Sequence, residues 1–117
     1  MAIAACLEAS GTRHISTATL FEAFCAIRRP KLLSCRIRFQ PLLDHLDLKV
    51  MPFDALQLDI AQDAYKRFGR GSGHSAGLNM GDCYSYALAK SLDMPLLFKG
   101  EDFIHTDIMS ALKNDPN

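Results

Sequence analysis

The hydrophobic pattern of the early part of the chain predicts a strand followed by a helix. Residues 13–16 fit a short strand, and Ser16 or Thr17 can cap the helix that follows. The apolar residues of this helix recur at the i, i+4, i+7 spacing of one helical face: Leu20, Phe24 and Ile27. Glu22 falls on a different face of the predicted helix, where its carboxylate is available for chemistry.

Two further segments of the first half carry helical patterns. Residues 1–9 fit the end of an Ala-rich helix that stops at Gly11. Residues 31–46 follow a helical spacing, and Pro41 is expected to kink or divide that helix because proline lacks a backbone N–H.

The second half of the chain alternates strands with helices. Residues 48–51 alternate like a strand, and Asp54 opens a capping box for a helix with the predicted buried stripe Leu58, Ala61, Tyr65 and Phe68. A glycine-rich loop over residues 69–81 leads to a helix over 82–92, and the apolar residues 95–99 predict a buried strand. This alternation predicts an α/β fold with a parallel sheet that helices cover on both faces.

Composition narrows the class of protein. The chain has 117 residues, of which 49% are hydrophobic and 22% charged, and this is typical of one globular domain spanning 1–117. It has 13 basic and 13 acidic residues, so the chain has no net positive charge by which it could bind nucleic acid. The four cysteines form no C-x-x-C pair, and no apolar run reaches the roughly 20 residues of a membrane span. We therefore expect a soluble cytoplasmic protein with reduced thiols and no membrane partner.

Three acidic residues are placed where α/β folds build their sites. Asp82 follows the glycine loop at the start of a helix, Asp102 follows the last strand, and Glu22 can reach the same sheet edge. Carboxylates that converge there repel one another unless a divalent cation neutralises them, and oxygen ligands select Mg²⁺ or Mn²⁺. The alternative is structural, with Asp82 as a helix N-cap and Asp102 as a turn residue.

Five basic residues lie within eleven positions that contain no acid: Arg28, Arg29, Lys31, Arg36 and Arg38. A solvated helix face is the simplest interpretation of this cluster. A surface that contacts RNA phosphates or a protein partner is the alternative.

The residues of three segments resemble one family. FGRGSGHSAGLNMGDCYSYALAKSLDMPLLFKGEDFIHTDI (residues 68–108) closely resembles the C-terminal half of VapC-type toxins, which are PIN-domain ribonucleases of bacterial toxin–antitoxin pairs. HISTATLFEA (14–23) is similar to the segment that carries the second acid of this family, and VMPFDALQLDIAQDAYKRFGRG (50–71) resembles its connecting strand and helix. The resemblance therefore extends over nearly the whole chain.

This resemblance implies a Mg²⁺- or Mn²⁺-dependent endoribonuclease with a PIN-like α/β/α sandwich. Carried over residue by residue, it implies that Glu22, Asp82 and Asp102 are the catalytic, metal-binding acids, with Asp107 at the rim of the site. It also implies a VapB-type antitoxin as partner, RNA as substrate and a homodimer.

The chain departs from the family pattern at its N-terminus. Family members begin with a hydrophobic strand that ends in an Asp, and this strand is not found before residue 13, so we expect a mainly parallel sheet without its first strand. Loss of one carboxylate weakens metal binding and positions water poorly. One hypothesis is therefore a PIN-fold ribonuclease toxin that is either N-terminally shortened by a misplaced start or a remnant with impaired activity. A second is an inactive binding module that sequesters an antitoxin through the helices between Thr17 and Leu46. A third is an α/β domain in which the acids serve as caps and turns.

Overall fold

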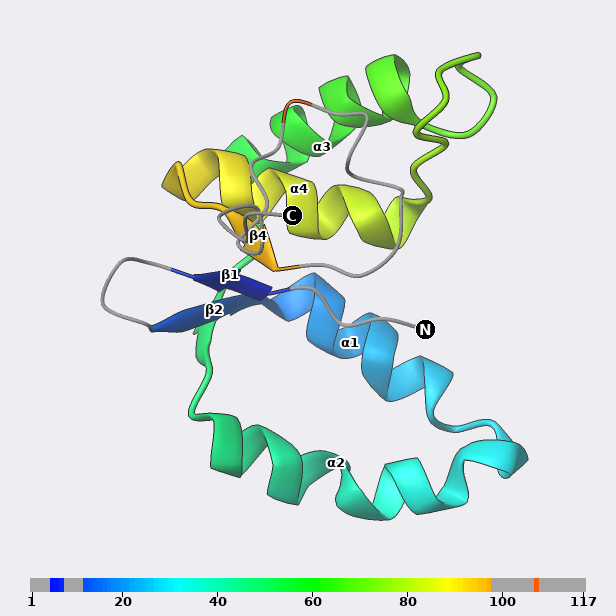
Figure 1. Ribbon diagram of the computed structural model, residues 1–117, viewed down its shortest axis with the longest axis vertical. Coiled ribbons are helices and arrows are strands. Elements are labelled where there is room, and N and C mark those ends of the chain that lie inside the picture. The colour runs from blue at the N-terminus through cyan, green and yellow to red at the C-terminus, as the bar shows by residue number, and fades with distance from the viewer. Residues whose placement is uncertain (1–4, 8–11, 98–106, 108–117) are drawn as a thin grey trace, which may run out of the picture.

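A four-stranded sheet with the strand order β3-β2-β1-β4 organises the chain (Figure 1). The computed structural model describes residues 5–7, 12–97 and 107. Its strands are β1 (Ala5–Leu7), β2 (Arg13–Ser16), β3 (Lys49–Met51) and β4 (Leu96–Leu97). Its helices are α1 (Thr17–Ala26), α2 (Leu33–Leu46), α3 (Ala55–Phe68) and α4 (Met80–Leu92), and the 3-10 turn η1 (Pro30–Leu32) precedes α2.

The sheet contains both parallel and antiparallel pairs. β2 pairs with β3 in parallel, with Ile15 opposite Val50, whereas β1 is antiparallel to β2 and to β4. Three of the four strands therefore run in one direction, and β1 occupies the place between β2 and β4 in the opposite direction. The helix predicted over residues 1–9 is wrong for Ala5–Leu7, because hydrogen bonds to two neighbouring strands outweigh the helical propensity of alanine-rich sequence.

The core forms where α3 packs against α4. Seven of the residues of α4 are buried, among them Tyr86 and Leu88, and α3 contributes Ala61, Ala64 and Phe68. Alanines at this contact let the two helix axes approach closely. The stripe predicted for α3 is wrong at Leu58 and Tyr65, which are 46% and 45% exposed, because the contact uses small side chains rather than large ones.

The helices α1 and α2 form an arm that extends from the sheet (Figure 1). In α1 the buried residues are Thr19 and Ala23, whereas Phe24 of the predicted stripe is exposed. No residue of α2 is buried, and Pro41 lies inside this helix without dividing it. Among the described helices, none has the length and hydropathy that a membrane span requires.

Side-chain caps set the starts of the helices. Ser16 Oγ accepts the N–H of Ala18 at 3.1 Å and caps α1, as predicted. Asp54 Oδ1 accepts the N–H of Gln57 at 3.0 Å and caps α3, but the Gln57 amide donates to the Pro52 carbonyl instead of closing the predicted capping box.

The glycine-rich loop between α3 and α4 folds back on itself. Its ends are joined by a parallel bridge between Gly69 and Leu78, and three of its glycines have positive φ angles: Gly71, Gly73 and Gly77. This backbone conformation favours glycine over any other residue. Because the two ends of the loop are paired, α4 begins close to the point where α3 ends.

Truncation of Leu78 tests whether this bridge closes the core. Leu78 is 0% exposed, so Leu78→Ala leaves a cavity and is expected to lower the free energy of unfolding by about 2–5 kcal/mol in urea denaturation. Leu56→Ala is the matched control, since Leu56 is 59% exposed and its truncation is expected to change stability by about 0.5 kcal/mol or less. Equal losses from the two variants would contradict this assignment of the core.

Candidate active site

The Glu22 carboxylate lies against the first turn of α4, where α1 packs on that helix. The two helices run antiparallel, and the hydroxyls of Thr19 and Ser85 contact each other at 3.4 Å inside this interface. Glu22 follows Thr19 by one helical turn, and Gly81 precedes Ser85 by one turn. The Glu22 carboxylate lies directly against Gly81, in the space that a Cβ atom at this position would occupy. The side chain from α1 therefore lies against the residue that precedes Asp82.

Asp82 is held in place by a reciprocal capping box at the start of α4. Asn79 Oδ1 accepts the N–H of Asp82 at 2.8 Å, and Asp82 Oδ2 accepts the N–H of Asn79 at 3.0 Å. The N-cap is therefore Asn79, and the helix begins at Met80 rather than at residue 82. The hydrogen bond from the Asn79 N–H fixes the orientation of the Asp82 carboxylate, which lies at the positive end of the helix dipole.

These two carboxylates fit part of a site for a hard divalent cation. Carboxylate oxygens are the ligands that Mg²⁺ and Mn²⁺ prefer, and an ion between Glu22 and Asp82 would offset their mutual repulsion. The third predicted acid, Asp102, lies outside the described residues. Within the part of the chain that the structure describes, no group of three or more His, Cys, Asp or Glu side chains has the arrangement of a metal site.

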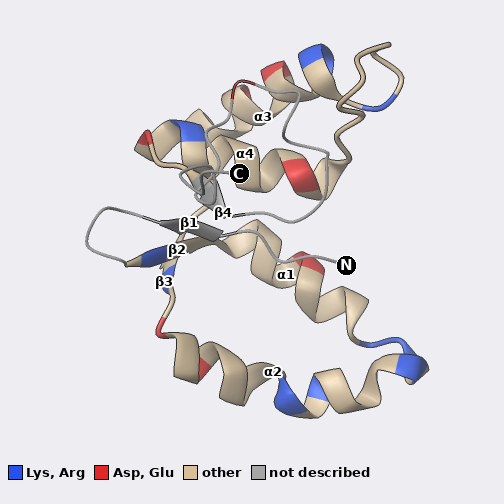
Figure 2. Ribbon diagram, viewed as in Figure 1, with Lys and Arg blue, Asp and Glu red and all other residues tan. Residues whose placement is uncertain are grey.

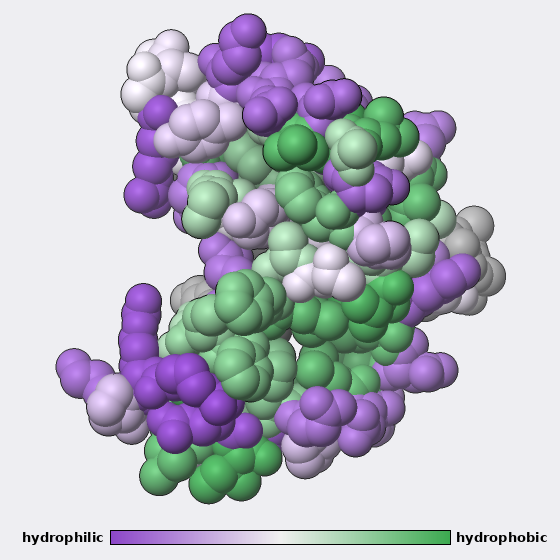
Figure 3. All heavy atoms as spheres, turned by 180° about the vertical axis from the view of Figure 1, so that it is seen from behind, coloured by the Kyte–Doolittle hydropathy of each residue, from purple (hydrophilic) through white to green (hydrophobic). Residues whose placement is uncertain are grey.

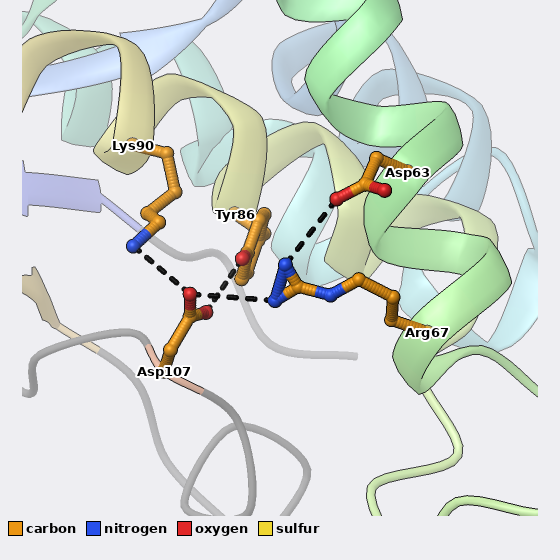
Figure 4. A network of polar contacts seen from close by, with 5 residues as sticks. All are labelled: Asp63, Arg67, Tyr86, Lys90 and Asp107. Carbon is orange, nitrogen blue, oxygen red and sulfur yellow. Dashed lines mark hydrogen bonds and ion pairs between the residues drawn. The ribbon is translucent and has the colours of Figure 1, made fainter.

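Asp107 is held by residues of α3 and α4 (Figure 4). Its carboxylate accepts a hydrogen bond from the Tyr86 hydroxyl at 2.5 Å and forms ion pairs with Lys90 at 3.1 Å and Arg67 at 3.4 Å. Arg67 also pairs with Asp63 at 3.3 Å. Tyr86 and Lys90 follow Asp82 by one and two helical turns, so they share its side of α4. The place of Asp107 at the rim of the site stays a prediction.

The surroundings of Asp107 shift the pKa values of its carboxyl group and of Tyr86. Burial opposes ionisation of Asp107, but hydrogen bonds from Tyr86 and Lys90 and the positive charges of Lys90 and Arg67 together hold its pKa below the ordinary value of 3.8. Burial, followed by the hydrogen bond to Asp107, raises the pKa of the Tyr86 hydroxyl. Tyr86 is therefore a hydrogen-bond donor at neutral pH. Burial likewise raises the pKa of the Cys83 thiol to about 11, so this residue does not supply a thiolate nucleophile.

Comparison with known proteins identifies the family of this chain. The PIN domain matches residues 1–109 of the chain. The chain belongs to the PIN-domain family. Its relatives include Ribonuclease VapC42 of Mycobacterium tuberculosis (strain ATCC 25618 / H37Rv), 47% identical over 107 residues, which cover 90% of this chain and 80% of the relative.

Two further relatives from the same strain support this assignment. Ribonuclease VapC28 is 41% identical over 113 residues, which cover 95% of this chain and 84% of the relative. Ribonuclease VapC30 is 44% identical over 115 residues, which cover 92% and 81%. The predicted resemblance to VapC-type PIN domains is confirmed.

The basic cluster of this PIN domain surrounds the turn between α1 and α2 (Figure 2). Arg36 stabilises this turn. Its guanidinium donates hydrogen bonds to the carbonyls of Ile27 and Arg28 at 3.2 Å and of Arg29 at 3.4 Å. The guanidinium of Arg28 lies 4.2 Å from the centre of the Phe24 ring. The remaining members of the cluster are exposed: Arg29, Lys31 and Arg38.

The sequence singled out Glu22 and Asp82 but missed the residues that contact them, Gly81 and Asn79. The spacing Asn79-x-x-Asp82 was a usable signal, since it is that of a capping box. A second signal was Gly81, because glycine within a helix is unfavourable unless another group approaches the backbone closely. The partners of Asp107 come from two helices and had no signal in local sequence.

The carboxylate of Asp107 is expected to stabilise the fold in a pH-dependent way. Its pKa is lowered in the folded state, so its contribution is present above the ordinary value of 3.8 and is lost as the pH falls through the folded-state pKa. Asp107→Asn should therefore lower Tm at pH 7, and the difference from the parent protein should shrink toward pH 3. Calorimetry in the presence of a chelator measures this effect, with Asp59→Asn on the exposed side of α3 as the control. A pH-independent difference would contradict the role of this charge.

Proposed function

We propose that this chain is the toxin of a toxin–antitoxin pair and that it cleaves RNA as a metal-dependent endoribonuclease. The observation that carries the proposal is the Glu22 carboxylate lying against Gly81 beside Asp82, at the acidic positions that the PIN-family resemblance implies. The names of the relatives, which are ribonucleases, support the same reaction.

In this proposal Glu22, Asp82 and Asp102 hold Mg²⁺ or Mn²⁺. A divalent cation bound there lowers the pKa of a coordinated water and offsets the charge that develops on the phosphate. The contribution of the chain is to hold two of these carboxylates in fixed directions, Asp82 through its bonds with Asn79 and Glu22 through its packing on Gly81. Without a cation their negative charges repel an RNA phosphate, so binding and cleavage both depend on the metal.

We assign RNA contact to the exposed basic residues around the turn η1. Arg29, Lys31 and Arg38 are exposed and Arg28 stacks on Phe24, whereas Arg36 holds the turn together. A phosphate backbone that passes this turn would gain favourable contacts on its way to the acids. This positive surface is local, since the net charge of the whole chain is zero.

The antitoxin, in this proposal, binds the arm formed by α1 and α2. Large hydrophobic side chains are exposed along it: Phe21, Phe24, Leu33, Ile37 and Leu42. Figure 3 shows hydrophobic side chains over much of the rear face of the molecule, with hydrophilic side chains gathered at the end of the arm. Exposed apolar area of this kind marks an interaction surface, and a VapB-type antitoxin is the partner that the family implies.

A groove beside this surface adds a feature that suits a peptide partner. It has a volume of about 440 Å³ and lies between α1, the C-terminal half of α2 and β3. Its walls are both apolar and acidic: Leu20, Gln40, Leu43, Asp44, Asp47, Leu48 and Val50. An antitoxin segment that carries apolar and basic side chains would match both features. A homodimer and action in the cytoplasm, where antitoxin and RNA are made, complete the proposal.

Substitution of the two acids tests the catalytic part of the proposal. Glu22→Gln and Asp82→Asn remove metal-binding charge and are each expected to lower Mn²⁺-dependent cleavage of structured RNA by about 100-fold or more, beyond the 10–100-fold typical of residues that only support a ligand. Asp59→Asn removes an exposed carboxylate elsewhere on the surface and should leave cleavage unchanged. Equal cleavage by the parent protein and Asp82→Asn would remove this residue from the mechanism, and cleavage that persists with a chelator would exclude a metal-dependent reaction.

A second substitution tests the antitoxin surface independently of catalysis. Ile37 is 68% exposed on α2, and Ile37→Asp places a charge in the proposed contact, so binding of the cognate VapB-type antitoxin should weaken by about 2 kcal/mol or more in calorimetry. Leu56→Asp, on the exposed side of α3, is the matched control. The RNA cleavage of both variants in the absence of antitoxin should equal that of the parent protein. Unchanged binding by Ile37→Asp would locate the antitoxin elsewhere.

A further inference from the structure

A side chain of α1 contacts the backbone of α4 at Gly81. A Cβ atom built on this residue would overlap both carboxylate oxygens and the Cδ atom of Glu22. Gly81 is buried and lies in the first turn of α4, where its φ angle is not positive, so backbone conformation alone does not require glycine there. Glycine also costs helical stability relative to alanine. The absence of a side chain is therefore explained by the carboxylate that occupies its place.

We propose that Gly81 is a positioning residue of the metal site, and that its missing side chain sets where the Glu22 carboxylate lies relative to Asp82. This inference rests on the proposed function, because it assigns a cause to the geometry of the two carboxylates. Gly81 itself contacts neither metal nor substrate in this proposal. It acts through Glu22 by leaving room for its carboxylate at the start of α4.

The packing around Gly81 leaves few ways to absorb an added methyl group. One turn away, the buried hydroxyls of Thr19 and Ser85 fix how α1 and α4 lie along each other, and each residue is 4% exposed. Ala23, next to Glu22, is buried at 1% exposure and prevents a rotation of α1 without loss of packing. The side chain of Glu22 is therefore the part that must move.

Asp82 cannot follow such a movement. Its backbone N–H and its carboxylate are both bonded to Asn79, which ties it to the first turn of α4. If Glu22 is displaced while Asp82 stays, the distance between the two carboxylates changes. Metal sites demand that ligand oxygens keep their separation, so affinity for the ion should fall.

The direct experiment is Mn²⁺ titration of Gly81→Ala by calorimetry, with the electron paramagnetic resonance spectrum of the bound ion as a second readout. We expect affinity to fall by about 10–100-fold and the spectrum to change, as for other residues that orient metal ligands. Met80→Ala changes the preceding, exposed residue of the same turn and should leave both readouts unchanged. Parent-like affinity for Gly81→Ala would overturn the inference.

The same substitution made in the Glu22→Ala variant separates a positioning role of Gly81 from a general effect on folding. In Glu22→Ala the carboxylate is gone, so adding Gly81→Ala should cause no further loss of Mn²⁺ affinity and should raise Tm through helical propensity alone. A further loss of affinity in this background would show that residue 81 acts other than through Glu22. If Glu22→Gln itself leaves Mn²⁺ affinity unchanged, the proposed metal site fails; if only Gly81→Ala leaves it unchanged, the site stands and the positioning role fails.

Discussion

The contact between α1 and α4 is the constraint on which the candidate site depends. Thr19 and Ser85 are 66 residues apart in sequence, yet their hydroxyls meet inside this contact. Because the helices run antiparallel, one turn in opposite directions from this pair brings Glu22 to Gly81 and hence beside Asp82. Asp82 is held within the first turn of its own helix, whereas the position of Glu22 at α4 depends on this contact. The site exists only when the first third and the last third of the chain pack together.

The molecule combines a well-packed half with a lightly packed arm. α4 supplies the largest share of the buried core and also carries Asp82, so the acid lies on the element with the least freedom to move. In α2, by contrast, no residue is buried, and the guanidinium of Arg36 connects this helix to the end of α1. Catalysis requires fixed carboxylates, whereas a surface for a protein partner requires exposed apolar side chains. In α1 the two meet, since this helix carries Glu22 as well as the exposed Phe21 and Phe24.

Local rules of sequence predicted much of the fold but not its close contacts. Ser16 and Asp54 were recognised as helix starts because a cap is a local interaction. Leu58 and Tyr65 were misassigned to the core because periodicity favours large apolar residues, while the contact of α3 with α4 selects alanine. The direction of β1 depends on hydrogen bonds to two distant strands, and no local pattern encodes it. The roles of Asp82 and Glu22 stay predictions, and the contact of Glu22 with Gly81 had no counterpart in local sequence patterns.

The distribution of charged side chains around the start of α4 favours the binding of a divalent cation. The whole chain is neutral, but Glu22 and Asp82 concentrate negative charge at the start of α4, where it opposes an approaching phosphate. The positive dipole of α4 offsets only part of this charge, equivalent to about half an elementary charge. Nearby Asp107 adds little repulsion, because Arg67 and Lys90 already balance it. A divalent cation supplies the missing positive charge, so metal dependence follows from the arrangement of the charges as well as from the chemistry of cleavage.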